Sequence, residues 1–421
     1  MRSDAIDKEI LSIGQRAKKA AQILAGISGA VRQKAIAAMP EKLLAVKESL
    51  FRANARDVQE AREKGVAGPL LKRLEITEKV FQYMLDRLQQ VAVLADPVGR
   101  VLEGHTRPNG LRVQKISVPL GVIGIIYESR PNVTTDAASV CLKSGNAVIL
   151  RGGSESLRTN IVLADAMIDA LTENGVPEHA VQIIRMPGHE AVDELLKLHD
   201  YIDVLIPRGG KSLIERIATG TRIPVIKHYE GICHLYLAED APGEMAVALS
   251  VNSKCQRVEV CNALETLLVD EKAARRLLPA LVKAFAENDV ELRGCERTRR
   301  IVREMKAATD EDWVTEYLAP ILSVKIVDGI DEAIDHINTY GSGHTDGIVT
   351  RNLALADRFV TLVDSASVLV NASTRLSGGG DYGLGAVVGI STDKLHARGP
   401  VGPQDLTSYK WVAYGHGHLR Q

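Results

Sequence analysis

The sequence predicts an α/β protein with two domains, each built on a parallel β-sheet, together with a small β flap. From about residue 121 onward, short apolar runs alternate with stretches that carry apolar residues at helical spacing. Runs such as Val122–Tyr127 are apolar at every position, as expected of parallel strands covered on both faces. With 421 residues the chain is also too long for one compact core. Strand–helix–strand repeats of this kind form doubly wound sheets, which often bind nucleotides.

Composition excludes several classes of protein. The 52 basic and 53 acidic residues are interspersed, so no basic surface for nucleic acid is indicated. The five cysteines show neither paired spacing nor a Cys/His ligand pattern, so we expect no disulfide framework, no metal site and a reducing compartment. No apolar signal region and no run of about 18 apolar residues is present, which favours a cytoplasmic protein without a membrane span.

Residues 1–102 are predicted to form amphipathic helices of the cofactor domain, because apolar residues recur three and four positions apart. The expected helices are 6–27, 31–39, 40–54, 56–64 and 78–93. Pro40 is expected to begin a helix, since proline suits a first helical turn and breaks a helix interior.

Two alternating segments predict exposed strands. Leu111–Val118, within residues 103–120, and Leu406–Tyr414 both alternate apolar and polar side chains. Exposed strand edges of this kind invite further pairing. We therefore expect a flap that pairs between subunits of a homo-oligomer; the alternative is a strand that only caps its own domain.

The remaining strands and helices fall into two α/β domains. In the dinucleotide-binding domain, residues 121–232, the expected strands are 122–127, 147–150, 180–185, 201–206 and 224–226, with helices at 134–143, 156–173, 190–199 and 212–219. In the catalytic domain, residues 233–370, the expected strands are 234–237, 264–269, 323–327, 347–350 and 367–370. Residues 371–421 are expected to return to the cofactor domain and to end in the flap strand.

Two strand-to-helix turns predict a cofactor site. Glycine pairs let the backbone approach an anion, and the helix N-terminus that follows supplies amide donors. Open α/β sheets bind ligands at this edge. Neither turn is a GxGxxG or a Walker loop, so we expect a dinucleotide that is seated in another way. The predicted cofactor-binding residues are Arg151, Gly152, Gly153, Ser154, Arg208, Gly209, Gly210, Lys211 and Ser212.

Cys261 is the predicted nucleophile. It lies near the end of the polar, glycine-free segment Ser253–Asn262, which we expect to be a loop, just before the apolar run Leu264–Val269. A thiol placed in this way is held by a rigid element and stays open to a ligand. Lys254 and Arg257 would favour its thiolate form. The alternative is a small buried side chain at the start of a strand.

Several long motifs carry a resemblance to a known family. They are 119–133, 142–153, 204–210, 261–268, 370–375 and 394–400. Together they resemble the γ-glutamyl phosphate reductases (glutamate-5-semialdehyde dehydrogenases) of the aldehyde dehydrogenase superfamily, over essentially the whole chain. The resemblance implies an aldehyde dehydrogenase-like fold and NADPH-dependent reduction of L-glutamyl 5-phosphate to L-glutamate 5-semialdehyde and phosphate, through a cysteine thioester, in L-proline biosynthesis. It also implies a homo-dimer or tetramer and raises an association with glutamate 5-kinase as an expectation.

The resemblance also implies roles for single residues. Cys261 would form the thioester, and Glu316 would hold the nicotinamide ribose of NADP(H). Asn262 would donate to the oxyanion, the alternative being a turn-forming residue. Arg151 matches the adenosine-ribose lysine of the superfamily. Ser154 stands where NAD-preferring relatives often carry a carboxylate, which would repel a 2′-phosphate, so NADP is favoured. The neighbouring carboxylate of Glu155 leaves the choice between NADP and NAD open.

One departure from the oxidising aldehyde dehydrogenases concerns the base that activates water. The corresponding stretch, Lys227–Gly231, places His228 at the base position, and a realignment by one gap would restore a carboxylate, that of Glu230. An enzyme whose thioester exchanges with phosphate gains from lacking a water-activating base. The substrate's anionic groups need cations, for which the candidates are Arg130, Arg257 and Arg375.

Two other functions stay open at this point. An NAD(P)-dependent dehydrogenase that oxidises a semialdehyde to an acid would show no dependence on phosphate. A non-catalytic dinucleotide-binding scaffold would keep the fold and lose the chemistry, and the presence of Cys261, Glu316 and both glycine turns argues against it.

Overall fold

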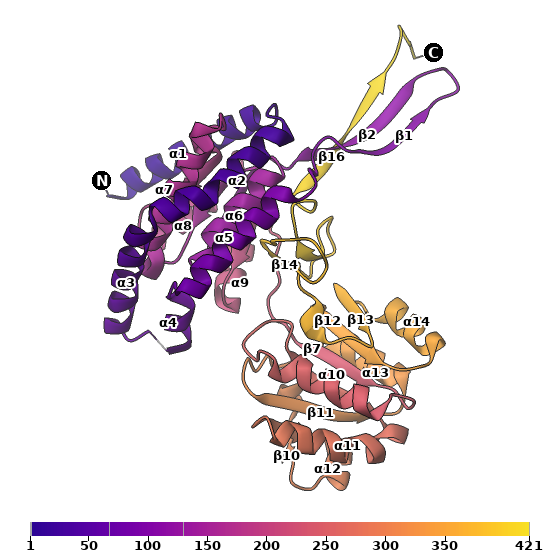
Figure 1. Ribbon diagram of the computed structural model, residues 1–421. Helices are drawn as coiled ribbons and strands as arrows, with labels where there is room; N and C mark the ends of the chain where they lie inside the picture. The colour runs from indigo at the N-terminus through magenta and orange to yellow at the C-terminus, as the bar shows by residue number, and fades with distance from the viewer. Residues whose placement is uncertain (1, 67, 129, 421) are drawn as a thin grey trace. The chain divides into compact units, whose positions relative to one another are not determined.

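The computed structural model describes residues 2–66, 68–128 and 130–420, and the chain forms two compact units (Figure 1). Unit 1 comprises the chain up to Lys227, Gly383–Gly389 and the chain from Val401 onward. Unit 2 comprises His228–Tyr382 and Ile390–Pro400. No helix in the described ranges is both long and apolar enough to cross a membrane.

Unit 1 contains the α-helices from α1 to α9. Its helices are α1 (Arg2–Leu24), α2 (Gly29–Ala45), α3 (Lys47–Glu63), α4 (Gly68–Leu74), α5 (Glu78–Val93), α6 (Asn132–Lys143), α7 (Leu157–Glu173), α8 (Glu190–Leu195) and α9 (Lys211–Gly220). Its strands are β1 (Val101–Thr106), β2 (Arg112–Pro119), β3 (Val122–Tyr127), β4 (Ala147–Arg151), β5 (Val181–Ile183), β6 (Val204–Arg208) and β16 (Thr407–Tyr414).

The core of unit 1 is a parallel sheet in the order β5-β4-β3-β6. Val122 and Ile126 of β3 pack in one cluster with Ile10 and Ile13 of α1. The intervening residue Ile125 is also fully buried, so both faces of the sheet are covered. The doubly wound fold predicted from continuous apolar runs is confirmed. The predicted strand at 224–226 is wrong, because in the described structure this segment makes only a single bridge, Leu205 to Val225.

Pro40 does not begin a helix, contrary to the sequence prediction. It lies inside α2, and the break falls at Val46, whose φ and ψ are −100° and 8°. A proline inside a helix removes one backbone hydrogen bond, at a cost of about 3 kcal/mol. Pro40 is buried next to Met39 and Leu43, and this burial offsets much of the loss.

The predicted flap strands are confirmed. β1, β2 and β16 form an antiparallel sheet in which β16 lies along β2, although the two are far apart in the sequence (Figure 1). Every residue of β1 is exposed, and Tyr409 and Trp411 of β16 are 52% and 55% exposed. Exposed aromatic side chains on an uncovered edge suit an interface, so pairing between subunits stays a prediction.

Unit 2 forms the second α/β domain. Its strands are β7 (Cys233–Leu237), β8 (Leu264–Asp270), β9 (Glu291–Gly294), β10 (Lys306–Ala307), β11 (Ile321–Val327), β12 (Thr345–Val349) and β13 (Ser367–Val370). Its helices are α10 (Gly243–Cys255), α11 (Glu271–Ala286), α12 (Glu296–Ile301), α13 (Ile330–Tyr340) and α14 (Leu353–Leu362). The short pair β14 (Gly389–Ser391) and β15 (Gly399–Val401) lies where the chain passes between the units.

The sheet of unit 2 is parallel, in the order β10-β9-β11-β8-β7-β12-β13. Alternate residues of the central strands face opposite layers: Leu267 packs with α10 and α11, and Leu268 packs with α13 and α14. The sequence did not predict β9 and β10, which are short and lie at the edge of the sheet.

The segment Ser253–Asn262 is not entirely a loop, because α10 continues to Cys255. Lys254 therefore lies in the last turn of a helix, where it is fully buried. Its Nζ lies 2.6 Å from Oε2 of Glu265 in β8. Burial raises the pKa of Glu265 to about 7 and lowers the pKa of Lys254, and each partner offsets the shift of the other. Lys254 is thus bound to a core carboxylate, and its expected role beside the Cys261 thiolate is not supported.

We predict that Lys254→Met lowers the free energy of unfolding of unit 2 by roughly 3–5 kcal/mol, because it leaves the carboxylate of Glu265 buried without its cation. Guanidinium unfolding followed by tryptophan emission measures this. Trp313 of unit 2 is buried and Trp411 is exposed, so the emission shift comes mainly from unit 2.

The matched control is Lys272→Met, which breaks the exposed pair with Glu239. An exposed pair contributes at most about 1 kcal/mol, so this variant should unfold almost like the wild type. The double variant Lys254→Met/Glu265→Gln should recover much of the loss. Equal effects of Lys254→Met and Lys272→Met would contradict the interpretation.

Candidate active site

Cys261 lies in the short loop between α10 and β8, three residues before the strand. Every residue of β8 is buried, whereas the side chain of Cys261 is half-buried. The thiol therefore sits on a segment held by the centre of the sheet and remains accessible from one side.

Gly231 brings a second segment against Cys261. A Cβ atom at position 231 would lie 1.8 Å from the carbonyl oxygen of Cys261, so only glycine fits this approach. The thiol of Cys233 donates to the same carbonyl oxygen at 3.2 Å. On its other side, the amide of Gly231 donates to Oε1 of Glu316 at 3.0 Å. One tight backbone contact thus places residues 228–233 between Cys261 and Glu316.

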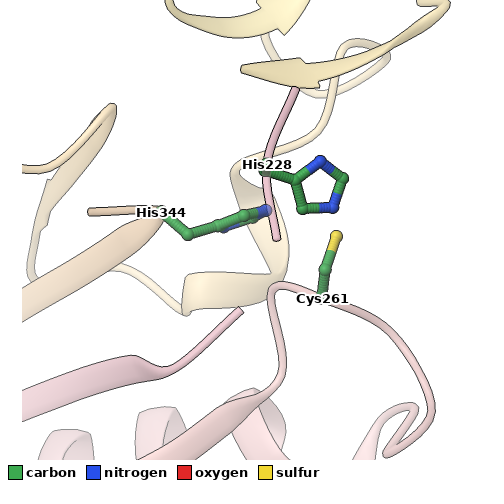
Figure 2. Close-up of side chains that lie close together, drawn as sticks. All are labelled: His228, Cys261 and His344. Atoms are coloured by element: carbon green, nitrogen blue, oxygen red, sulfur yellow. The ribbon is translucent and has the colours of Figure 1, made fainter. Parts of the chain in front are cut away.

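His228, Cys261 and His344 form a group whose donor atoms all lie within 4.8 Å of one another, with the side chains directed toward a common point (Figure 2). Nδ1 of His228 lies 3.0 Å from the carbonyl oxygen of Ile390. A carbonyl oxygen only accepts hydrogen bonds, so Nδ1 carries the proton and Nε2 keeps a lone pair. Figure 2 shows this second nitrogen beside the sulfur of Cys261. Of the two base candidates, His228 belongs to the group and Glu230 does not.

His344 was not predicted from the sequence. It is buried directly before β12, and its ring lies edge-on to that of His228 with the centroids 5.5 Å apart. Nδ1 of His344 lies 2.8 Å from Oγ1 of Thr345. The only signal in the sequence was the position of this histidine before an apolar strand, and a single histidine there is usually structural.

Of the three candidate substrate arginines, Arg375 lies within electrostatic range of Cys261. Burial lowers the pKa of Arg375, and the Cys261 thiolate partly offsets this while Arg257 adds to it, so both lie within electrostatic range of Arg375. Nε of Arg375 donates to Oε1 of Gln256 at 3.0 Å. Nε of Arg257 lies 3.4 Å from Oε1 of Glu259. Arg130, the third candidate, belongs to unit 1.

Asn262 joins the loop of Cys261 to the segment that carries Arg375. Its Nδ2 lies 3.3 Å from the carbonyl oxygen of Arg375 and 3.3 Å from Oγ of Ser377. Its own carbonyl oxygen accepts a hydrogen bond from Oγ1 of Thr374 at 2.8 Å. The side-chain amide is therefore used within the protein, and donation to an oxyanion stays a prediction.

Three of the other thiols are poor nucleophiles. Burial raises the pKa of Cys141, Cys233 and Cys255, which disfavours their thiolates. Cys261 is the cysteine that combines partial exposure with a neighbouring imidazole, and this geometry favours it as the nucleophile.

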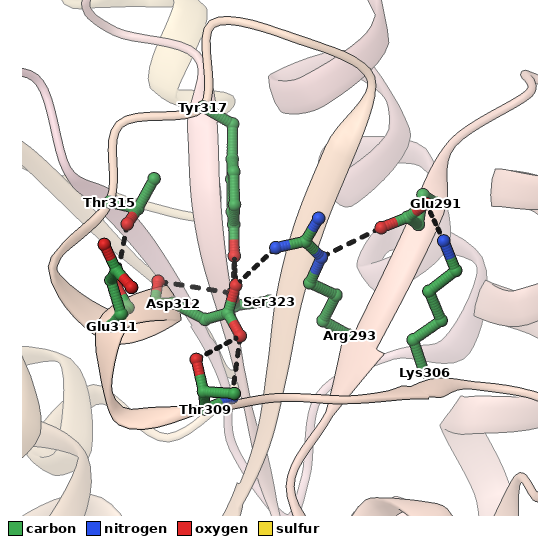
Figure 3. Close-up of polar contacts among 9 residues, drawn as sticks. All are labelled: Glu291, Arg293, Lys306, Thr309, Glu311, Asp312, Thr315, Tyr317 and Ser323. Carbon is green, nitrogen blue, oxygen red and sulfur yellow. Dashed lines mark hydrogen bonds and ion pairs between the residues drawn. The ribbon is translucent and has the colours of Figure 1, made fainter.

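The loop that carries Glu316 is fixed by a polar network (Figure 3). Oδ1 of Asp312 accepts hydrogen bonds from Tyr317 at 2.6 Å and from Arg293 at 2.7 Å. Oδ2 accepts from the amide and the hydroxyl of Thr309. Burial alone would raise the pKa of Asp312, but the hydrogen bonds from Tyr317, Thr309 and Arg293 hold it at about 2. For Glu316 itself, burial raises the pKa, and the Gly231 amide partly offsets the shift.

In unit 1, a cavity of about 500 Å³ lies at the carboxyl ends of β3 and β4. Arg151, Gly153 and Ser154 of the first predicted turn line it. The guanidinium of Arg151 donates to the carbonyl oxygens of Gly152 and Gly188. A Cβ atom at Gly152 would lie 2.1 Å from Nδ2 of Asn160, so any larger residue here would displace that side chain. Size and position suit part of a dinucleotide.

The second predicted turn is arranged differently. Gly209 and Gly210 follow Arg208, the last residue of β6, and Lys211 and Ser212 begin α9. The amide of Gly210 donates to Oε2 of Glu128 at 2.9 Å, so a carboxylate of the protein already occupies part of the expected anion cradle. In the part of the chain that the structure describes, none of these five turn residues lines the cavity of the first turn.

Comparison with known proteins defines the class first. The aldehyde dehydrogenase family model matches residues 3–297 and 302–383, and the chain belongs to this family. It is therefore an oxidoreductase that acts on an aldehyde. Family members use NAD(P). An engineered glycolyl-CoA reductase with bound NADP+, 16% identical over 96% of each chain with a TM-score of 0.67, shares the fold.

Two solved γ-glutamyl phosphate reductases are more similar. The enzyme from Thermotoga maritima is 43% identical, and the match covers 98% of this chain and 100% of that chain with a TM-score of 0.96. The enzyme from Saccharomyces cerevisiae is 33% identical over 97% and 98% of the two chains, with a TM-score of 0.54. The resemblance and the aldehyde dehydrogenase-like fold predicted from the sequence are confirmed.

We predict that Asp312→Asn lowers the free energy of unfolding of unit 2 by about 2 kcal/mol at neutral pH. The pKa of Asp312 in the folded protein, about 2, lies below its ordinary value of 3.8. The ionised carboxylate therefore stabilises the fold above about pH 4, and this stabilisation is lost as the pH falls toward 2. Guanidinium unfolding at pH 7 and at pH 2, followed by Trp313 emission, measures the difference.

The control is Asp310→Asn, which changes an exposed carboxylate of the same helical turn. Its unfolding free energy should equal that of the wild type at both pH values. A loss in Asp312→Asn that is as large at pH 2 as at pH 7 would show that the shifted pKa is not the source.

Proposed function

We propose that the protein catalyses NADPH-dependent reduction of L-glutamyl 5-phosphate to L-glutamate 5-semialdehyde and phosphate, as a step of L-proline biosynthesis. The observation that carries the proposal is the 43% identity over the whole chain with a γ-glutamyl phosphate reductase. The pairing of a half-buried thiol with an oriented imidazole supports it independently.

In the first step, His228 accepts the thiol proton of Cys261 on Nε2, while the carbonyl oxygen of Ile390 holds Nδ1–H and stabilises the imidazolium. The thiolate attacks the acyl carbon, a C–S bond forms, and the C–O bond to phosphate breaks. The departing phosphate takes the proton from His228. The product is a thioester on Cys261, which accepts hydride more readily than an oxygen ester.

For the second step, NADPH, when bound, would supply the hydride that the thioester carbon of Cys261 accepts. The resulting thiohemiacetal on Cys261 collapses, the C–S bond breaks, and the aldehyde leaves while the sulfur regains the electron pair. Glu316, at the Gly231 amide, is proposed to hold the nicotinamide ribose, and Asn262 is proposed to lie close to the oxyanion. Water must be excluded during this step, because hydrolysis of the thioester would give the acid.

The anionic ends of the substrate need cations. Arg375 lies within electrostatic range of both Cys261 and Arg257, so we propose that Arg375 binds the phosphate group together with Arg257, with Arg130 as a further candidate for an anionic end of the substrate. In unit 1, Arg151 and Ser154 are proposed to bind the adenosine part of NADP(H) in the cavity that they line. Lys64 lines the same cavity and adds a positive charge that suits a 2′-phosphate, whereas Glu155 lines it too and adds a negative one.

We predict that, with the semialdehyde supplied as its cyclised pyrroline form, NADP is reduced only when phosphate is present. Phosphate must release the acyl group from Cys261 in this direction, so Cys261→Ala should lose the reaction altogether. The measurement is NADPH absorbance with and without phosphate.

Cys255→Ala is the matched control, because it removes a half-buried thiol of the same segment. It should keep at least half of the wild-type rate. Phosphate-independent turnover would instead indicate an oxidising dehydrogenase, and turnover that survives in Cys261→Ala would mean that another residue is the nucleophile.

We predict that Arg375→Ala raises the KM for phosphate by about 10–100-fold, because a charge-assisted contact worth about 1.5–3 kcal/mol is lost. Arg375→Lys should recover only part of this, since an ammonium cannot bind an oxyanion through two parallel hydrogen bonds. Steady-state kinetics at saturating semialdehyde measure the change.

The control is Arg358→Ala, which removes an exposed arginine of α14 that pairs with Asp331 of α13. Its KM for phosphate should match that of the wild type. An unchanged KM in Arg375→Ala would remove Arg375 from the phosphate site.

A further inference from the structure

The topology of unit 2 brings three metal-binding side chains to one edge of the sheet. His228 precedes β7, Cys261 precedes β8, and His344 precedes β12. These strands are neighbours in the order β8-β7-β12 and run parallel, so their amino ends lie side by side. The group therefore comes from three separate segments, and no ligand spacing is visible in the sequence.

The donor set is that of a zinc site with an open position. One thiolate and two imidazole nitrogens suit Zn²⁺, and three protein ligands leave the fourth tetrahedral position for water. With ordinary Zn–S and Zn–N bonds, the donors of such a site lie about 3.4–3.6 Å apart. The donors here lie within 4.8 Å of one another, so a closure of roughly 1.4 Å at most completes the geometry.

The imidazole of His228 is already held in the way that a zinc ligand usually is. A histidine that binds a metal normally engages its other ring nitrogen with a carbonyl, a carboxylate or water. Nδ1 of His228 donates to the carbonyl oxygen of Ile390, and Nδ1 of His344 lies beside the hydroxyl of Thr345. For His228 the contact leaves Nε2 as the ligand atom.

Nearby charges limit the affinity. The guanidinium of Arg375 lies within electrostatic range of Cys261 and repels a dication, whereas Glu316, within range of His344, attracts one. Two opposing charges beside a three-ligand set favour reversible binding rather than a permanent structural metal.

We propose that His228, Cys261 and His344 bind Zn²⁺ reversibly and that this binding switches the enzyme off. The thiol proton of Cys261 is released when the Zn–S bond forms, so the sulfur lone pair that would attack the acyl group is occupied by the metal. Inhibition rests on the proposed role of Cys261 as nucleophile, whereas binding itself does not. Hard cations such as Mg²⁺ prefer oxygen ligands and should have no effect.

The first experiment measures binding without any assay of activity. The full chain, freed of metal with a chelator that is then removed, is titrated with Co²⁺ as a spectroscopic probe. We expect a thiolate-to-cobalt charge-transfer band and intense visible bands of a tetrahedral site at one equivalent, both abolished by one equivalent of Zn²⁺. Cys261→Ala should lose the charge-transfer band, and Cys255→Ala, which changes a thiol outside the group, should keep it.

His344→Ala should weaken Zn²⁺ binding by at least about 10–100-fold, since loss of a mere supporting partner already costs that much. His344→Gln serves as a second variant if the alanine variant does not fold. A matched control, His199→Ala, removes an exposed histidine of unit 1 and should bind as the wild type does. A cobalt spectrum that persists in Cys261→Ala, or that lacks the thiolate band, would overturn the proposal.

The second experiment uses the wild type alone. Zn²⁺, but not Mg²⁺, should slow alkylation of Cys261 by iodoacetamide at least tenfold, as followed by peptide mass analysis, and a chelator should restore the rate. Zn²⁺ should also inhibit the phosphate-dependent reaction over the same concentration range. If the protein proves to act on another substrate, the cobalt band and the protection of Cys261 still test the site. Unchanged alkylation in saturating Zn²⁺ would refute it.

Discussion

The close approach of Gly231 to the main chain of Cys261 is the contact on which the rest of the site depends. Any side chain at position 231 would overlap the carbonyl group of Cys261, which accepts a hydrogen bond from Cys233. Because this approach is so close, His228 is carried to the thiol, and the amide of Gly231 reaches Glu316. This contact thus brings together the proposed nucleophile, base and ribose-binding carboxylate, and the carbonyl of Ile390 and the hydrogen bonds of Asp312 hold His228 and the Glu316 loop further.

The sheet explains why these residues can meet at all. Parallel strands present their amino ends at one edge, so short segments before β7, β8 and β12 converge there without long loops. The cavity that suits the dinucleotide lies instead at the carboxyl ends of β3 and β4, in unit 1. The group around Cys261 thus lies at the amino ends of one parallel sheet and the cavity at the carboxyl ends of the other, a difference that sequence periodicity alone does not reveal.

The sequence predicts the buried strands and the flap strands, because each has a local pattern of apolar residues. It also predicts the position of the Cys261 thiol, because the apolar run of β8 follows directly. Lys254 could not, since a lysine in a polar stretch gives no sign that its partner, Glu265, lies buried in the next strand. His344 could not be predicted for a similar reason, because it comes close to His228 only when β12 pairs with β7. The prediction for Pro40 was wrong because proline usually breaks a helix interior. The sequence does not show that Pro40 is buried inside α2, where its packing offsets the lost hydrogen bond.

The buried carboxylate of Glu265 shows how a costly group can serve the site. Its Oε2 binds Lys254 at the end of α10, and its Oε1 accepts the amide of Leu318 at 3.3 Å. Leu318 has a φ of 51°, a left-handed conformation that is unfavourable for a branched side chain and persists only where its surroundings fix it. Glu265 thus joins the helix before the nucleophile to the loop that carries Glu316. A hydrophobic pair of similar volume would be no less stable, but it could not hold the Leu318 amide in place. The ion pair is therefore better explained by the geometry that it imposes on the two loops than by stability alone.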